Sequence, residues 1–253
     1  MDYTYREYEG ILKCLTDHGY VIKNYGDTHD SKKEVILRHD VDISLDKAVR
    51  FAELENMFGG GYSSTYFVLI SSDFYNPLSK ASIDAMKRII SLGHKIGLHF
   101  DELKYCGDDD WNQNLVIEKI LEEKKRLESI IEDSVDVVSM HRPSKKTLEA
   151  NLSIPGMINS YGREYFNDIK YVSDSYHRWR ENVYDVVETG TPKIQLLTHA
   201  FWYNDISLTR SQAFRQYIDG AKDVTYKLLE DNILPPGVTM EESFVEEEDN
   251  DEN

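Results

Sequence analysis

The sequence has little cysteine, no long apolar run and a shortage of positive charge. Only Cys14 and Cys106 occur among 253 residues, and their separation lacks the Cys-x-x-Cys spacing of a metal or redox site. Two isolated cysteines argue against a disulfide framework and fit a reducing compartment. No stretch approaches the roughly 20 apolar residues of a membrane-spanning helix, which excludes a transmembrane protein. The N-terminus also lacks the basic start and apolar centre of a secretory signal, so we expect a cytoplasmic protein.

The charge balance limits the choice of partner. There are 46 acidic against 29 basic residues, and the net charge is -17. Such an excess of negative charge disfavours nucleic acid as a partner. Part of this excess lies at the end of the chain, where residues 241–253 contain eight acids and no base. We expect residues 1–240 to form a single domain and residues 241–253 to be a disordered acidic tail.

Strand-like apolar runs alternate with helix-like segments along the chain. The expected strands cover residues 34–39, 64–70, 95–99, 135–140, 169–173, 183–187 and 193–198. The expected helices cover residues 4–17, 44–57, 81–92, 112–132 and 209–229. Strands that alternate with helices indicate a parallel sheet or barrel. About seven strands favour an α/β fold with a distorted (β/α) barrel of parallel strands.

Histidines and acids gather directly after the apolar runs. They are His39, Asp40, Asp42, His99, Asp101, Glu102, His141, Asp174 and His199, together with Arg142. In parallel folds the carboxyl ends of the strands carry the chemistry. A buried cluster of carboxylates and imidazoles without a metal or a substrate would have a large desolvation cost. The sequence therefore predicts a site at this rim.

The spacing of Asp40 and Asp42 is the most informative detail. Residues two apart on a strand project to the same side, roughly 6 to 7 Å from each other. This gap suits an ion on one carboxylate and a water that contacts the other. Hydrolytic zinc sites take about three Asp, Glu or His ligands and leave a position open, and His99 offers an imidazole. The alternative is a plain turn or cap before a helix that begins near Ser44.

The order of these segments resembles the polysaccharide deacetylases of carbohydrate esterase family four. The similarity runs from about residue 35 to residue 203, and its five motifs are residues 37–42, 93–99, 141–144, 173–175 with Trp179, and 195–199. The resemblance implies that Asp40 is the general base, that Asp42 and His99 bind the metal, and that His199 is the general acid.

This chain departs from the family pattern at three places. A second metal-binding His usually follows the first by four positions, where this chain has Leu103. The candidates for a third ligand are Asp101, Glu102 and His141; we favour His141, because it ends an adjacent strand and imidazole suits zinc, iron or nickel.

The other two departures concern the residues that orient the base and the acid. Residues 141–144 stand where the family has an Arg-x-Pro element whose Arg orients the base, which implies a role there for His141 or Arg142. Arg178 occupies the place of the Asp that orients the acidic His, so we expect Asp174 to serve instead.

The resulting hypothesis is a metal-dependent hydrolase that removes an N-acetyl or other acyl group from a sugar or saccharide. It needs one divalent ion, with zinc the first choice, and the aromatic residues Tyr176, Trp179, Trp202 and Tyr203 are candidates for stacking on a sugar ring or for ordinary packing. A cytoplasmic location favours a soluble, lipid-linked or short saccharide, as in the synthesis of surface polysaccharides. Two alternatives remain open: a carbohydrate-binding barrel with impaired catalysis, and an HD-type phosphohydrolase centred on His39 and Asp40, which would require a helix there.

Overall fold

The computed structural model describes residues 1–27, 30–58 and 62–241. The chain divides into two compact units, Met1–Ser207 and Leu208–Asn253. Among the described residues, the first unit contains the strands and all the residues predicted for the site, and the second contains the helix α8 (Arg210–Asn232). The predicted domain through residue 240 therefore spans the first unit and α8, while residues 242–253 of the expected tail lie outside the described residues.

The first unit is built on one parallel sheet. Its strands are β1 (Val21–Ile22), β2 (Glu34–Val41), β3 (Thr65–Leu69), β4 (Lys95–Phe100), β5 (Val137–Met140), β6 (Ile158–Asn159), β7 (Lys170–Ser173) and β8 (Lys193–Thr198). They are ordered β6-β5-β4-β3-β2-β8-β7, and β1 pairs with the start of β2. Within the described residues β6 and β7 are the two ends of this order, so the barrel is distorted and open there. The predicted α/β fold is confirmed.

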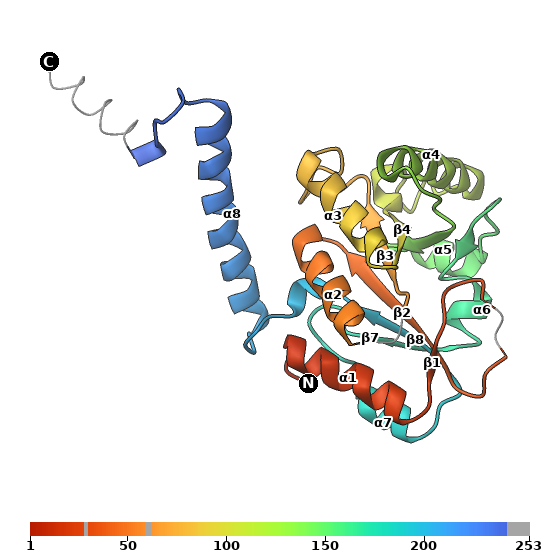
Figure 1. Ribbon diagram of the computed structural model, residues 1–253. Coiled ribbons are helices and arrows are strands. Elements are labelled where there is room, and N and C mark those ends of the chain that lie inside the picture. Colours follow the sequence, from red (N-terminus) through yellow and green to blue (C-terminus); the bar gives the residue numbers. More distant parts are fainter. Residues whose placement is uncertain (28–29, 59–61, 242–253) are drawn as a thin grey trace, which may run out of the picture. The chain divides into compact units, whose positions relative to one another are not determined.

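Helices surround this sheet (Figure 1). They are α1 (Tyr5–Asp17), α2 (Leu45–Met57), α3 (Lys80–Ser91), α4 (Gln113–Ile131), α5 (Lys145–Ala150), α6 (Arg163–Phe166) and α7 (Val183–Glu188), with short 3-10 helices η1 (Glu102–Lys104) and η2 (Ala200–Trp202). The long helices begin at hydroxyl or amide side chains that accept a hydrogen bond from the first turn, such as Thr4 and Ser44. The helices predicted over the four long segments of this unit are confirmed.

One predicted strand is wrong. Residues 183–187 form helix α7, although their valines favour a strand. The side chain of Asn182 accepts a hydrogen bond from the backbone of Tyr184 and caps the helix, and Val183, Val186 and Val187 all lie on one buried helical face. The short strands β1 and β6 were not predicted, because two-residue strands leave no periodic pattern in the sequence.

Strand β2 shows how the sheet separates its two faces. All eight of its residues are buried, as expected for a parallel strand covered on both sides. Side chains alternate along it, so Ile36, Arg38 and Asp40 share the inner face of the curled sheet, and Leu37 and His39 share the outer face. The inner face carries the candidate site.

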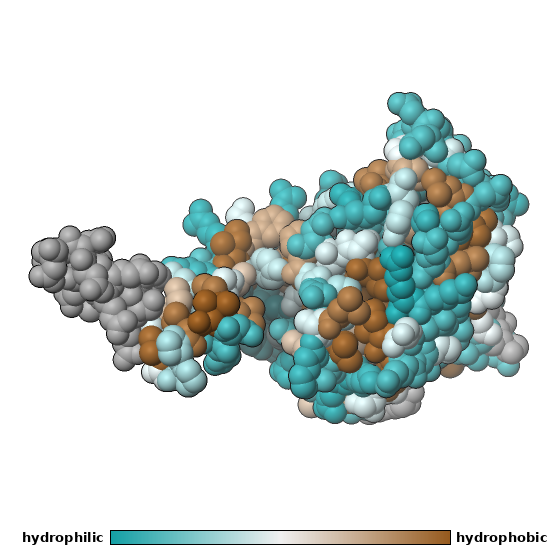
Figure 2. Space-filling view, turned by 90° about the horizontal axis from the view of Figure 1, so that it is seen from above, coloured by the Kyte–Doolittle hydropathy of each residue, from teal (hydrophilic) through white to brown (hydrophobic). Residues whose placement is uncertain are grey.

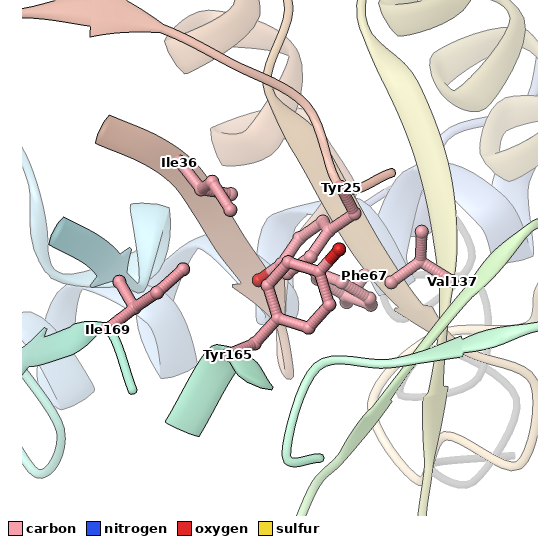
Figure 3. Packing of buried hydrophobic residues seen from close by; sticks show 6 residues of the cluster. All are labelled: Tyr25, Ile36, Phe67, Val137, Tyr165 and Ile169. Atoms are coloured by element: carbon pink, nitrogen blue, oxygen red, sulfur yellow. The ribbon is translucent and has the colours of Figure 1, made fainter. Parts of the chain in front are cut away.

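Aromatic and aliphatic side chains fill the inside of the curl. The cluster consists of Tyr25, Ile36, Phe67, Val137, Tyr165 and Ile169, whose side chains point toward one another (Figure 3). Gly97 on β4 makes room for it, because a Cβ there would lie 2.6 Å from the ring of Phe67. The same ring lies 5.2 Å from the guanidinium of Arg38. The core therefore supports the floor of the site.

The visible surface mixes hydrophilic and hydrophobic residues (Figure 2). Hydrophilic residues cover much of the visible face, and hydrophobic residues gather in separate patches between them (Figure 2). Among the described helices, none combines the length and the apolar character needed to cross a membrane.

Candidate metal and catalytic site

Three side chains from neighbouring strand ends converge on one point. Asp42 follows β2, His99 lies on β4 and His141 follows β5. Oδ1 of Asp42 is 3.1 Å from Nε2 of His99 and 3.1 Å from Nδ1 of His141, and these two nitrogens are 3.2 Å apart. The structure therefore brings together the three residues that the sequence analysis favoured as metal ligands.

The triangle of ligand atoms fits a small divalent ion. Zinc ligands lie about 2.0 to 2.1 Å from the ion, so two ligands of a tetrahedral site are about 3.3 Å apart. The three separations in this cluster are close to that value, and one carboxylate with two imidazoles suits zinc, iron or nickel. Only 25% of the Asp42 side chain is exposed to solvent. The donor set thus fits a metal with protein on one side and access on the other.

The local charges keep Asp42 in its ligand form. Burial alone would raise the pKa of Asp42, but hydrogen bonds from His141 and His99 outweigh burial and hold the pKa well below its usual value. Tyr75 fixes the backbone beside it: its hydroxyl donates to the carbonyl of Val41 at 2.8 Å and accepts from the amide of Leu69 at 2.9 Å. These two hydrogen bonds link the ends of β2 and β3 and fix the backbone directly before Asp42.

Asp40 lies next to this cluster and is held by Arg38. Nε and Nη2 of Arg38 donate to the two carboxylate oxygens at 2.9 and 2.8 Å, and Oδ2 of Asp40 is 3.6 Å from Nε2 of His99. Burial alone would raise the pKa of Asp40, but the Arg38 guanidinium outweighs burial and lowers the pKa. Asp40 is therefore an ionised carboxylate held in one orientation.

Arg38 is the residue that the sequence analysis missed. It is completely buried, donates to the hydroxyl of Ser139 and lies over the ring of Tyr161, with 4.8 Å between guanidinium and ring centre. The signal was present in the sequence, because the two-residue spacing that pairs Asp40 with Asp42 also pairs Arg38 with Asp40.

Asp174 and His199 form a second pair at the adjacent strand ends. Nδ1 of His199 is 2.6 Å from Oδ1 of Asp174, and the amide of His199 donates to both oxygens of that carboxylate at 3.1 Å. Nε2 of His199 faces the cluster, 3.7 Å from Oδ2 of Asp42. Burial alone would lower the pKa of His199, but Asp174 raises it to about 9. The ring therefore carries a proton at neutral pH.

The other candidates near the rim have different partners. The guanidinium of Arg142 donates to Asp101, whereas Arg38 takes the place beside Asp40. The carboxylate of Glu102 accepts from the backbone of Ser144 and from the hydroxyl of Thr147, so it holds the loop after β5. Of the three residues considered as a third ligand, His141 is thus the one that faces the Asp42 cluster.

The aromatic candidates divide by exposure. Trp202 and Tyr203 are buried and Trp179 is half-buried, whereas 77% of Tyr176 is exposed. Tyr176 lies two residues after Asp174. Tyr176 and His177 have positive φ angles of 63° and 59°, which residues other than glycine rarely adopt. Stacking of His177 on Tyr3, with ring centres 4.0 Å apart, supports this turn. Tyr176 is therefore the candidate most available to a ligand.

The structure also tests the alternative of an HD-type phosphohydrolase. His39 and Asp40 lie on strand β2 and not on a helix, and their side chains take opposite faces of the sheet. His39 contacts Glu55 and Thr198, while Asp40 contacts Arg38. This alternative is therefore wrong, because the two side chains do not converge on a common ion.

Comparison with known proteins finds similarity to solved structures. No model of a known protein family matches the chain, and no curated protein matches it. The Xyl-CE4 domain of a multidomain xylanase from the hindgut metagenome of Trinervitermes trinervoides is 16% identical, with 83% of this chain and 96% of that chain covered and a TM-score of 0.41. The chitin deacetylase of the fungal pathogen Colletotrichum lindemuthianum is 12% identical, with 81% and 86% covered and a TM-score of 0.46.

A third similar structure is a CE4 family pseudoenzyme from Bacillus anthracis. It is 14% identical, with 78% of this chain and 63% of that chain covered and a TM-score of 0.41. At such low identity the activity of this chain has to follow from its own residues.

Proposed function

We propose that this protein is a metal-dependent hydrolase that removes an acetyl or other acyl group from a sugar or saccharide by cleaving a carbon–nitrogen amide bond. One observation carries the proposal: an oriented carboxylate, Asp40, and a protonated imidazole, His199, both lie beside a three-residue ligand cluster, 3.6 Å from His99 and 3.7 Å from Asp42. A base and an acid beside a metal site are the groups that acyl transfer to water requires.

The proposed mechanism assigns each residue one task. Asp42, His99 and His141 would hold a divalent cation, with zinc the first choice, and its Lewis acidity would lower the pKa of water at the site. Asp40, kept ionised and in place by Arg38, accepts the proton of the attacking water. Arg142, which the resemblance placed near the base, donates to Asp101 instead, and Arg38 orients Asp40.

His199 completes the reaction. Because its pKa is raised to about 9 by Asp174, it holds a proton at neutral pH and donates it to the departing amine. Asp174 also fixes which ring nitrogen faces the reaction, since Nδ1 is occupied by the carboxylate and Nε2 points toward Asp42.

The substrate class comes from the resemblance of the five sequence motifs to carbohydrate esterase family four. Tyr176 offers an exposed ring for a sugar, and the negative net charge disfavours nucleic acid. We propose a cytoplasmic substrate such as a soluble activated sugar or a short saccharide for surface polysaccharides.

The test combines metal analysis with acetate release. The purified protein should retain about one divalent ion per chain and release acetate from N-acetylated nucleotide sugars or short saccharides. Asp40→Asn should keep the ion and slow release by about two to four orders of magnitude, the usual contribution of general base catalysis. Asp84→Asn makes the same chemical change in the exposed Lys80–Asp84 ion pair of α3 and should keep the wild-type rate.

Two outcomes would contradict the proposal. Equal turnover of wild type and Asp40→Asn would exclude Asp40 as the base. A protein that binds its ion and saccharides but releases acetate from none would be a carbohydrate-binding barrel with impaired catalysis.

A further inference from the structure

A second cluster of histidines and a carboxylate lies on the outer face of the sheet, under α2. Its centre is Glu55, which is 0% exposed. The carboxylate accepts hydrogen bonds from the hydroxyls of Tyr8, Ser64 (2.6 Å) and Tyr66 (3.0 Å), and Nε2 of His39 lies 2.9 Å away. Three neutral donors and one imidazole therefore surround a buried carboxylate that plays no part in the proposed mechanism.

His94 also lies near Glu55 but has other partners. Its Nδ1 accepts from the amide of Ser64 at 3.2 Å, and its Nε2 donates to the carbonyl of Ala52 at 3.1 Å. An Nδ1 that accepts a hydrogen bond carries no proton. Nδ1 of His94 therefore donates no hydrogen bond to Glu55, although it lies 3.4 Å from Oε2 of Glu55. The imidazole that bonds Glu55 is therefore His39.

His39 connects Glu55 to the end of β8, directly before His199, the proposed general acid. Its Nδ1 is 2.7 Å from the hydroxyl of Thr198 on β8. His39 and Thr198 are direct partners in the register of β2 and β8. Each is followed by a residue of the proposed mechanism, since Asp40 comes next on β2 and His199 comes next after β8.

We propose that His39 and Thr198, anchored by Glu55, are positioning residues that fix the ends of β2 and β8 against each other. In a strand, consecutive side chains project to opposite faces. A bond between His39 and Thr198 on the outer face therefore sets how Asp40 and His199 are placed on the inner face. This inference rests on the proposed function, because it assigns the base and the acid to those two residues.

The test removes the link between the strands without changing shape. Thr198→Val replaces a hydroxyl by a methyl group of similar size, and Thr198→Ser keeps the hydroxyl. Because small misplacement of reacting groups slows catalysis strongly, Thr198→Val should lower kcat at least about tenfold and change KM less than about twofold. Thr198→Ser should restore most of kcat.

A matched control separates positioning from stability. Ser64→Ala removes another hydrogen bond of Glu55, one that does not join β2 to β8. It should lower Tm to a similar extent and leave kcat within about twofold of wild type. An equal loss of kcat in Ser64→Ala and Thr198→Val, or no rescue by Thr198→Ser, would overturn the positioning role.

Amide hydrogen exchange tests the link without any substrate. The amide of His199 should exchange at least about tenfold faster in Thr198→Val than in wild type or Ser64→Ala, because the end of β8 has lost its anchor. Unchanged exchange would overturn the proposal even if turnover were found. Faster exchange in a protein that shows no turnover would instead contradict the proposed function and leave the link between the strands in place.

Discussion

The two faces of the same sheet each carry a cluster of histidine and carboxylate. The clusters differ in the hydrogen-bond partners and in the solvent exposure of the carboxylate. On the outer face, Glu55 is fully buried and accepts hydrogen bonds from neutral hydroxyls as well as from His39. On the inner face, Asp42 is partly exposed and its close partners are imidazole nitrogens. Among the described residues the buried Nδ1 of His99 also has no hydrogen-bond partner.

This difference shows how a site can be told from a structural polar cluster. A buried carboxylate with enough hydrogen-bond donors is stable without an ion. In the inner cluster, one carboxylate oxygen and two imidazole nitrogens lie within 3.2 Å of one another. The lone pairs of these atoms repel unless a proton or a metal ion lies between them. We therefore expect loss of the inner carboxylate to affect metal binding and loss of the outer carboxylate, Glu55, to affect the stability of the fold.

The largest effect is expected for metal binding by the inner cluster. Asp42→Ala removes the one carboxylate of the ligand set and should weaken zinc binding by more than about a hundredfold, since even residues that only support ligands contribute about 10- to 100-fold. Isothermal titration calorimetry with zinc would measure this loss, and circular dichroism should show that the fold survives. Stoichiometric metal in the variant after dialysis against a weak chelator would contradict the ligand assignment.

The next effect concerns the stability of the outer cluster. Glu55→Ala leaves His39 and three hydroxyl groups without their acceptor in a buried place, so the free energy of unfolding should fall by about 3 kcal/mol or more. Urea unfolding of wild type and variant measures the change. Asp42→Ala serves as the comparison, and if it destabilised the protein more than Glu55→Ala does, the distinction between the clusters would be lost.

The contribution of Glu55 to the stability of the fold should depend on pH. Burial alone would raise the pKa of Glu55, but His39 outweighs burial and lowers it to about 2, against 4.5 for an ordinary Glu. A lowered pKa stabilises the fold above about pH 4.5, and this contribution is lost as the pH falls toward 2. The stability difference between wild type and Glu55→Gln should therefore shrink by about 2 kcal/mol between pH 5 and pH 3. A difference that is constant over this range in urea unfolding would show that folding does not lower the pKa of Glu55.

The smallest effect is a shift in the titration of His199. With Asp174 beside it, the ring should keep its proton up to a pH of about 9. Asp174→Asn removes the main cause of this raised pKa, so the pKa should fall, although the carboxylates of Asp42 and Asp40 still favour the charged ring. NMR titration of the metal-free protein measures both values, with Asp84→Asn as the control. An identical pKa in wild type and Asp174→Asn would contradict the pairing of these residues.

Much of the fold could be predicted because its signals are local. Strand β2 contains the apolar run Val35, Ile36 and Leu37, two of which are β-branched, and side chains such as Thr4 and Ser44 mark where helices begin. The strand predicted over the valines of α7 is wrong because their packing on one helical face outweighs their preference for strands.

For the site, the sequence by itself determined which residues stand at the strand ends. Parallel strands place their carboxyl ends at one rim, and alternation places Asp40 and Asp42 on one side of β2. It did not determine which of these side chains meet. His141 faces His99 across 42 positions of sequence, Arg38 reaches Ser139 across 101, and His39 reaches Thr198 across 159. Only the curl and register of the sheet decide such contacts, because they depend on the packing of distant strands and not on spacing within one segment.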